Sequence, residues 1–274
     1  MLLNNEKVEG LRVNFKGINS FQLKWLAIAF MVVDHVNSYF GSQLGFPSWV
    51  AWLGRFVAPL FVFLLVEGFR HTRSRAKYAK RLGLAAFVTA IGNVVYQLLT
   101  GAYINPLTHQ PDYFLFLGPH NIFLTLFLLF CMMWVLATMK QSSVGQKIML
   151  ILTFLILLVL TAASEGGIYL IPMMLLMFVF KEEGQRNKLL IGIFVYTMIL
   201  LALAISSYMQ TPVNQSLYDY LTFDNEFMMV TVIPLIALYN GQLGGTNSKW
   251  NKYFFYLFYP IHLWIIYVIF YFVR

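Results

Sequence analysis

The sequence predicts an all-α, polytopic membrane bundle of about nine transmembrane helices, or ten if one long segment divides differently. Of the 274 residues, 59% are hydrophobic and 11% are charged, and the mean hydropathy is +0.70. Soluble domains carry about 25% charged residues. Apolar runs recur along the chain near the length of about 20 residues that crosses a bilayer. We therefore expect one membrane domain over residues 1–274. Its first 20 residues form a short polar N-terminal segment.

Each predicted span is an apolar run between polar loops. In chain order the spans are 21–40, 50–69, 81–99, 114–138, 147–163, 167–180, 188–207, 226–240 and 253–273. The sixth and eighth are short, so we expect them to be tilted or partly covered by their neighbours. Gly118-Pro119 lies early in the fourth segment, and the turn SEGG separates the fifth from the sixth. Pro260 predicts a kink in the ninth.

The loops alternate in charge, which predicts the orientation. Lys and Arg gather in the N-terminal segment and in every second loop, and the intervening loops 41–49, 100–113, 164–166 and 208–225 contain none. The positive-inside rule then puts the N-terminus in the cytoplasm and the C-terminus outside, in agreement with an odd number of spans. Only Arg274 disagrees with this pattern.

Composition and motifs exclude several functions. The net charge of +8 could indicate a nucleic-acid partner, but the basic residues lie in short loops, where orientation and lipid headgroups explain them. We therefore expect a bilayer partner and no nucleic acid. The sequence contains no HExxH, Walker or G-x-S-x-G motif, and we expect no metal. One cysteine cannot build a disulfide framework within the chain.

The first span carries polar residues where a bilayer penalises them. Lys24 and His35 are eleven residues apart, about three helical turns and roughly 16 Å along an axis, so they share one helix face. With Asp34 and Arg55 they form the first candidate site. His35 could act as a general base or a nucleophile, with Asp34 assisting it and Arg55 orienting a carboxylate. The alternative is a structural ion pair beside a hydrogen-bonded core histidine.

A second cluster lies at the predicted cytoplasmic end of the second span. It holds six Lys or Arg residues within residues 70–81, preceded by Glu67. Arg70 and Arg73 share a helix face, and with Arg75 they could bind phosphate. Taken alone, the cluster is better explained by the positive-inside rule and anionic headgroups. Glu67 and His71, four apart, could form a purely structural pair.

Three further polar features lie near the predicted outer half of the bundle. His120 and Asn121 could form only a helix cap, or they could line an acceptor site. Glu165 in the SEGG turn is either solvated or in contact with an acceptor. His262, two residues after Pro260, is either a hydrogen-bonded kink residue or part of a cavity wall.

Three segments carry a family resemblance: LKWLAIAFMVVDHVN, GRFVAPLFVFLLVEGFRHTR and FYPIHLW. They resemble the TraX family of conjugal-transfer membrane proteins, known as pilin acetyltransferases. The wider transmembrane acyltransferase group is similar in design. In its acyltransferase-3 members a Lys or Arg, ten residues and a His mark the first helix, which here falls on Lys24 and His35. An R-x-x-R near a cytoplasmic helix end falls on Arg70 and Arg73.

The resemblance implies a multi-pass enzyme of the bacterial cytoplasmic membrane that uses acetyl-CoA as co-substrate. The acceptor would be an amine, on a pilin-like protein or an amino-glycan, or a hydroxyl, in or outside the membrane. Lys24, Arg70, Arg73 and Arg75 would bind the donor, with the arginines and their neighbours on its phosphates, and the thioester would reach His35 between the first, second and ninth spans. The alternative from another class is a secondary transporter or channel that uses the intramembrane Asp, His and Arg residues. It predicts internal repeats and broken helices in both halves. A non-enzymatic assembly scaffold is a third possibility.

Overall fold

The computed structural model describes residues 17–105, 108–112, 120–182, 184–210, 215–245 and 249–273, and this part of the chain is helical, with no strands. The helices are α1 (Ser20–Phe40), η2 (Ser48–Trp52), α2 (Val57–His71), α3 (Arg75–Thr100), α5 (Ile122–Met139), α6 (Val144–Ala162), α7 (Gly167–Val179), α8 (Arg186–Gln210), α9 (Leu217–Phe223), η3 (Glu226–Val232), α10 (Ile233–Leu238) and α11 (Lys249–Val273). The all-α prediction is confirmed.

Polar residues in the loops start the helices that carry the candidate site. Asn19 caps α1, accepting a hydrogen bond from the Gln22 amide at 3.0 Å while the Gln22 side chain accepts from the Asn19 amide. Ser74 caps α3 by accepting a hydrogen bond from the Lys77 amide at 3.3 Å. Such caps satisfy backbone N–H groups that have no partner inside the helix. The apolar runs therefore begin at defined residues, which sets the depth of Lys24 and His35 in α1.

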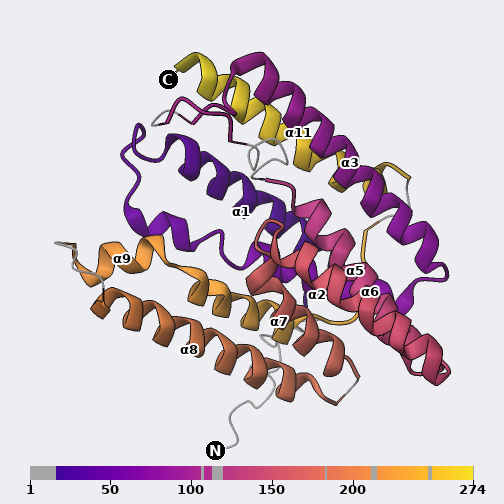
Figure 1. Ribbon diagram of the computed structural model, residues 1–274. Coiled ribbons are helices and arrows are strands. Elements are labelled where there is room, and N and C mark those ends of the chain that lie inside the picture. The colour runs from indigo at the N-terminus through magenta and orange to yellow at the C-terminus, as the bar shows by residue number, and fades with distance from the viewer. Residues whose placement is uncertain are drawn as a thin grey trace, which may run out of the picture.

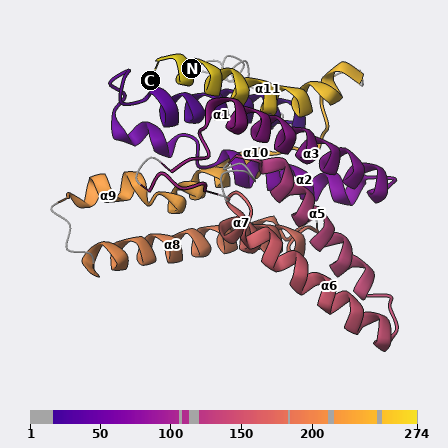
Figure 2. The ribbon, with the colours of Figure 1, turned by 45° about the horizontal axis from the view of Figure 1, so that its top comes forward.

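Helix α2 lies at the centre of the bundle. It packs against α1, α5 and α7, and α11 lies between α1 and α3 (Figure 1). Helix α6 instead packs mainly on α5 and α7 and extends away from the bundle (Figure 2). Thr161 is the only buried residue of α6, and half of its other side chains are exposed apolar groups. An apolar helix exposed on this scale is typical of a lipid-facing span.

The described helices support a multi-pass membrane protein but do not confirm nine spans. The described part of each of the nine predicted segments contains helix. By length and composition six described helices can cross a membrane, or seven if the bent pair Leu217–Phe223 and Glu226–Leu238 is one span. Helix α7 has only 13 residues. Helix α1 has 21 residues and is not one of the six. Polar residues, among them Lys24, Asp34 and His35, lower its mean hydropathy.

Two predicted segments differ from the observed elements. The eighth, 226–240, is a 3₁₀ helix followed by the six-residue α10, and it meets α9 at an angle of 70°. The fourth, predicted from residue 114, begins as helix at Ile122, and residues 113–119 lie outside the described part of the chain. Apolar composition identified both segments but could not locate their helix starts.

The alternating charges of the loops place basic residues at one end of the bundle, which we call the basic end. Lys181, just after α7, lies there close to Lys140, Arg70 and Arg75. Partial burial and these neighbouring positive charges lower the pKa of Lys181. The opposite end, which we call the acidic end, carries Asp34, Glu165 and Glu226. Whether the basic end faces the cytoplasm stays a prediction.

Candidate active site

Two cavities adjoin inside the bundle, one toward each end. The basic-end cavity, of about 470 Å³, reaches from Lys24 to Tyr259. The acidic-end cavity, of about 300 Å³, contains His35 in its wall. They share four wall residues, Met31, Phe61, Ile122 and Tyr259. Because Met31 is one helical turn before His35 on α1, the boundary between the cavities lies beside the His35 ring.

Lys24 and Arg81 are the Lys and Arg residues in the wall of the basic-end cavity. Lys24 lies 5.5 Å from the centroid of the Phe255 ring, and Arg81 stacks at 5.2 Å over Tyr78. Neither forms an ion pair within the described part of the chain, and the buried Arg81 Nε has no hydrogen-bond partner there. Both side chains are half-buried, and Arg81 is also hydrogen-bonded with Tyr256, so the wall of this cavity carries two cations without an anionic partner among the described residues.

The three arginines singled out by the sequence lie outside the walls of both cavities. Arg70 is engaged by Glu67, with 2.7 Å between Nη1 and Oε1, and Arg75 stacks at 4.4 Å over the Phe69 ring. Arg73 is exposed in the loop before α3. The predicted Glu67–His71 pair is present at 3.8 Å. Lys24 and Arg81 lie in the wall of the basic-end cavity, and none of these three arginines does.

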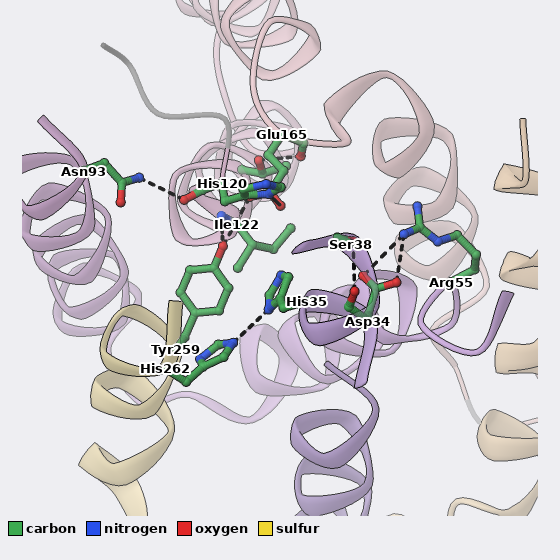
Figure 3. A network of polar contacts seen from close by, with 11 residues as sticks. Asp34, His35, Ser38, Arg55, Asn93, His120, Ile122, Glu165, Tyr259 and His262 are labelled. Carbon is green, nitrogen blue, oxygen red and sulfur yellow. Dashed lines mark hydrogen bonds and ion pairs between the residues drawn. The ribbon is translucent and has the colours of Figure 1, made fainter. Parts of the chain in front are cut away.

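The acidic-end cavity holds one guanidinium between two carboxylates. Arg55 Nη2 donates to Asp34 at 3.1 and 3.3 Å, and Arg55 Nη1 lies 3.6 Å from Glu226 Oε2. The predicted Asp34–Arg55 pair is therefore present (Figure 3). Gly54 permits it, because a Cβ at that position would collide with the Asp34 carboxyl group. Asp34 is directed to Arg55, and no hydrogen bond joins it to His35.

Glu165 completes the acidic wall. His120 Nδ1 lies 3.3 Å from Glu165 Oε1, and the Tyr259 hydroxyl donates to Oε2 at 3.3 Å (Figure 3). The Ile122 amide donates in turn to the Tyr259 oxygen at 3.3 Å. The Glu165 carboxylate of the SEGG turn therefore contacts both His120, just before α5, and Tyr259 of α11. Glu165 is held inside the cavity mouth and is not simply a solvated turn residue.

Buried amides fix the position of His120. Asn93 of α3 donates to the His120 carbonyl at 3.1 Å and accepts from Trp264 Nε1 at 3.1 Å. Asn121 caps α5 through the Leu124 amide and donates to the Ala86 carbonyl at 3.0 Å. Asn121 therefore has the capping role, whereas His120 lines the cavity. These amide hydrogen bonds tie the backbone around His120 to α3 and α11.

His35 forms its hydrogen bond with another histidine. His35 Nδ1 and His262 Nε2 are 2.8 Å apart, and both residues are buried, at 7% and 8% exposure. The ring centroids are 5.0 Å apart with an angle of 28° between the ring planes, and the His120 ring lies 5.8 Å from His35 (Figure 3). Three histidines from α1, α5 and α11 thus gather where the two cavities adjoin.

Comparison with known proteins identifies the family. The family model described as TraX protein matches residues 20–270. This chain belongs to the TraX family. It is also 30% identical over 255 residues to a protein named "Probable fimbrial assembly protein FimC" of Dichelobacter nodosus, a match that covers 89% of this chain and 93% of the relative. No solved structure matches it.

Most of the candidate residues of this TraX-family chain meet in the two cavities. The acidic-end cavity brings together Asp34, His35, Arg55, His120 and Glu165, with His262 behind His35. Lys24 and Glu67 line the basic-end cavity.

Sequence reasoning did not single out Arg81, Tyr259 or Glu226 as site residues. Tyr259 belongs to the FYPIHLW segment and Arg81 to the basic cluster, so a signal was present for both. Glu226 begins the eighth predicted span, and its pairing with Arg55 depends on the tertiary fold.

Proposed function

We propose that this TraX-family protein is a membrane-embedded acetyltransferase that moves an acetyl group from acetyl-CoA to an amine. The observation that carries the proposal is the meeting of two cavities of opposite character beside the His35 imidazole. A thioester entering from the basic end and an amine entering from the acidic end would come together at a histidine. Histidine is the side chain most often used for proton transfer at neutral pH.

The basic-end cavity supports a CoA thioester as donor. Its two unpaired cations, Lys24 and Arg81, suit the phosphates of a CoA head. Most of the remaining wall is apolar or aromatic, including Phe61, Leu65 and Phe123, and suits a long, thin pantetheine arm. Lys24 precedes His35 by roughly 16 Å along α1, so a small donor could not reach both, whereas an extended one can.

The acidic-end cavity supports an amine over a hydroxyl as acceptor. Its walls carry three carboxylates, Asp34, Glu165 and Glu226, against the single cation Arg55, which leaves a formal charge of −2 with neutral histidines. A surplus of carboxylates concentrates and orients a cationic amine and disfavours an anionic acceptor. The relative named for fimbrial assembly suggests the N-terminal amine of a pilin-like subunit as the acceptor in the cell.

The chemistry requires one proton acceptor and no covalent intermediate. The acceptor, bound as an ammonium, first releases one proton to water. The resulting neutral amine attacks the thioester carbonyl, the C–N bond forms, and the C–S bond breaks. The proton released by the amine passes to the His35 ring and then to the departing thiolate, giving an amide and free CoA. Separate cavities for donor and acceptor allow both to be bound at once, which favours direct transfer over an acetyl-histidine carrier.

One feature matches the transporter alternative. The bent pair of α9 with η3 and α10, at 70°, is a broken element of the kind that lines transport sites. It contributes Glu226 to the acidic-end cavity. Flux of protons or sodium ions through protein-containing vesicles, without acetyl transfer, would support that alternative over the enzyme.

Acetyl transfer by the purified protein in detergent tests the proposal. We expect label from radioactive acetyl-CoA to appear on a short peptide with a free N-terminal amine. We expect at least tenfold less label on a control peptide of the same length whose N-terminus is blocked and which offers only a serine hydroxyl. Initial rates at varied donor and acceptor concentrations should give intersecting lines in double-reciprocal plots, as expected when both substrates are bound together.

Three outcomes would contradict parts of the proposal. Absence of acetyl transfer to both the amine peptide and glucosamine would refute the proposed amine acetyltransferase activity. Faster transfer to the serine peptide would remove the amine preference. Parallel lines with an isolable acetyl-protein would replace direct transfer with an acetyl-histidine carrier.

A further inference from the structure

His35 and His262 form the first part of a chain of hydrogen bonds that ends on a backbone carbonyl. His35 Nδ1 and His262 Nε2 are 2.8 Å apart, and His262 Nδ1 lies 2.9 Å from the Phe258 oxygen. The Phe258 ring stacks on the His262 ring at 5.1 Å with an interplanar angle of 15°. The carbonyl contact and the stacked ring together hold the His262 imidazole in one orientation.

The carbonyl determines which nitrogen of each neutral ring carries the proton. A carbonyl oxygen only accepts hydrogen bonds, so His262 Nδ1 must donate and therefore carries a proton. A neutral imidazole has one proton, which leaves His262 Nε2 as an acceptor. The facing His35 Nδ1 must then be the donor. The proton of His35 is therefore on Nδ1, and its Nε2 has a free lone pair.

The free Nε2 of His35 is the atom that a base needs. His35 lines the acidic-end cavity, and His262 occupies the Nδ1 side of the ring. Figure 3 shows the His35 ring beside His262, with His120 and Tyr259 nearby, at the place where the cavities adjoin. With the opposite tautomer, Nε2–H would face the incoming amine, and His35 could not accept its proton.

We propose that His262 is a positioning residue that holds His35 in the Nδ1–H tautomer and shares the proton His35 gains. This rests on the proposed acetyl transfer. When His35 Nε2 takes the amine proton, the ring becomes a cation whose Nδ1–H already points at the His262 lone pair. His262 can then take that proton and spread the positive charge over two rings. The proton returns to His35 Nδ1 as Nε2 protonates the thiolate, so the cycle balances.

Two substitutions of similar size separate positioning from packing. In His262→Gln, the amide oxygen can still accept from His35 Nδ1, whereas the thioether of His262→Met is only a weak acceptor. We expect His262→Met to lower kcat by about 100-fold, the lower range of general-base effects. We expect His262→Gln to stay within about tenfold of wild type. The KM for acetyl-CoA should be unchanged in both, because neither variant alters Lys24 or Arg81. Equal losses in the two variants, or full activity of His262→Met, would overturn the positioning role.

A measurement independent of activity tests the same assignment. Nitrogen-15 NMR of protein labelled at its five histidines distinguishes the two tautomers, and single-histidine variants assign the signals. We expect His35 and His262 both as Nδ1–H in wild type, and loss of the fixed tautomer of His35 in His262→Met. A wild-type His35 signal from the Nε2–H tautomer would overturn the inference.

The two experiments also separate this inference from the proposed function. Acetyl transfer by wild type together with an Nε2–H signal for His35 would refute the inference and leave the acetyltransferase intact. An Nδ1–H pair in a wild-type protein without transfer would refute the acetyltransferase, and the assigned tautomers alone would remain. In that case the proposed sharing of a proton between His35 and His262 during catalysis would be refuted as well.

Discussion

Replacing His35 by alanine is expected to abolish acetyl transfer while the protein stays folded in the membrane. General-base catalysis contributes about 10²–10⁴-fold, so we expect a loss of about 10³-fold in kcat. No other neutral base has the same position. His120 is turned toward Glu165 at 3.3 Å, and His262 has one nitrogen on the Phe258 carbonyl. Donor binding should persist, because Lys24 and Arg81 are untouched.

A second variant keeps this prediction testable if the alanine variant unfolds. In His35→Gln the side-chain amide can still donate to His262 Nε2, but it cannot accept a proton from an amine. We expect the same loss of kcat with a normal elution profile on size exclusion in detergent. His109→Asn is the matched control, since His109 lies in a loop with a φ of 53°, which asparagine tolerates. Full activity of folded His35→Gln would contradict the account.

The double variant Lys24→Met with Arg81→Met is expected to raise the KM for acetyl-CoA by about 10²–10⁴-fold. Hydrogen bonds to charged groups contribute about 1.5–3 kcal/mol each, and both cations face the proposed donor cavity. Methionine keeps much of the length and apolar surface of either side chain. The turnover at saturating donor should change little, because these residues lie away from His35.

The matched control is Arg73→Met, which removes an exposed arginine of the same basic end. We expect no change in the donor KM for this variant, contrary to what the R-x-x-R resemblance implies. The measurement is the initial rate against acetyl-CoA concentration for each variant. A larger effect from Arg73→Met than from the double variant would move the donor phosphates to the exposed arginines. It would leave the proposed use of the basic-end cavity without support.

The sequence predicted the helices and their depth better than the contacts of the site. Periodicity and length indicated the helical segments, and the spacing of Lys24 and His35 placed them in adjoining cavities. The pairing of Asp34 with Arg55 also followed from their predicted common depth. The number of spans did not follow. Helix α1 is polar, α7 is short, and the segment containing η3 is broken. Composition alone therefore does not decide whether each of these three segments crosses the membrane.

Contacts between distant segments could not be predicted from one sequence. His35 and His262 are 227 residues apart, and nothing local indicates that their rings meet. In the sequence, Arg81 and Arg70 belong to the same basic cluster, and nothing local distinguishes them. Their difference arises because Glu67 neutralises Arg70, whereas Arg81 enters the cavity over Tyr78. Local patterns show charge and depth, whereas the fold decides which charges remain unpaired.

The most direct test of the central claim is the sidedness of transfer in sealed proteoliposomes of known protein orientation. Acetyl-CoA is supplied on one side only, and a peptide with a free N-terminal amine is trapped on the other. The account predicts acetylated peptide when the donor meets the basic end and the peptide meets the acidic end, and none when the sides are exchanged. Equal transfer in both arrangements, or transfer only with donor and peptide on the same side, would contradict it.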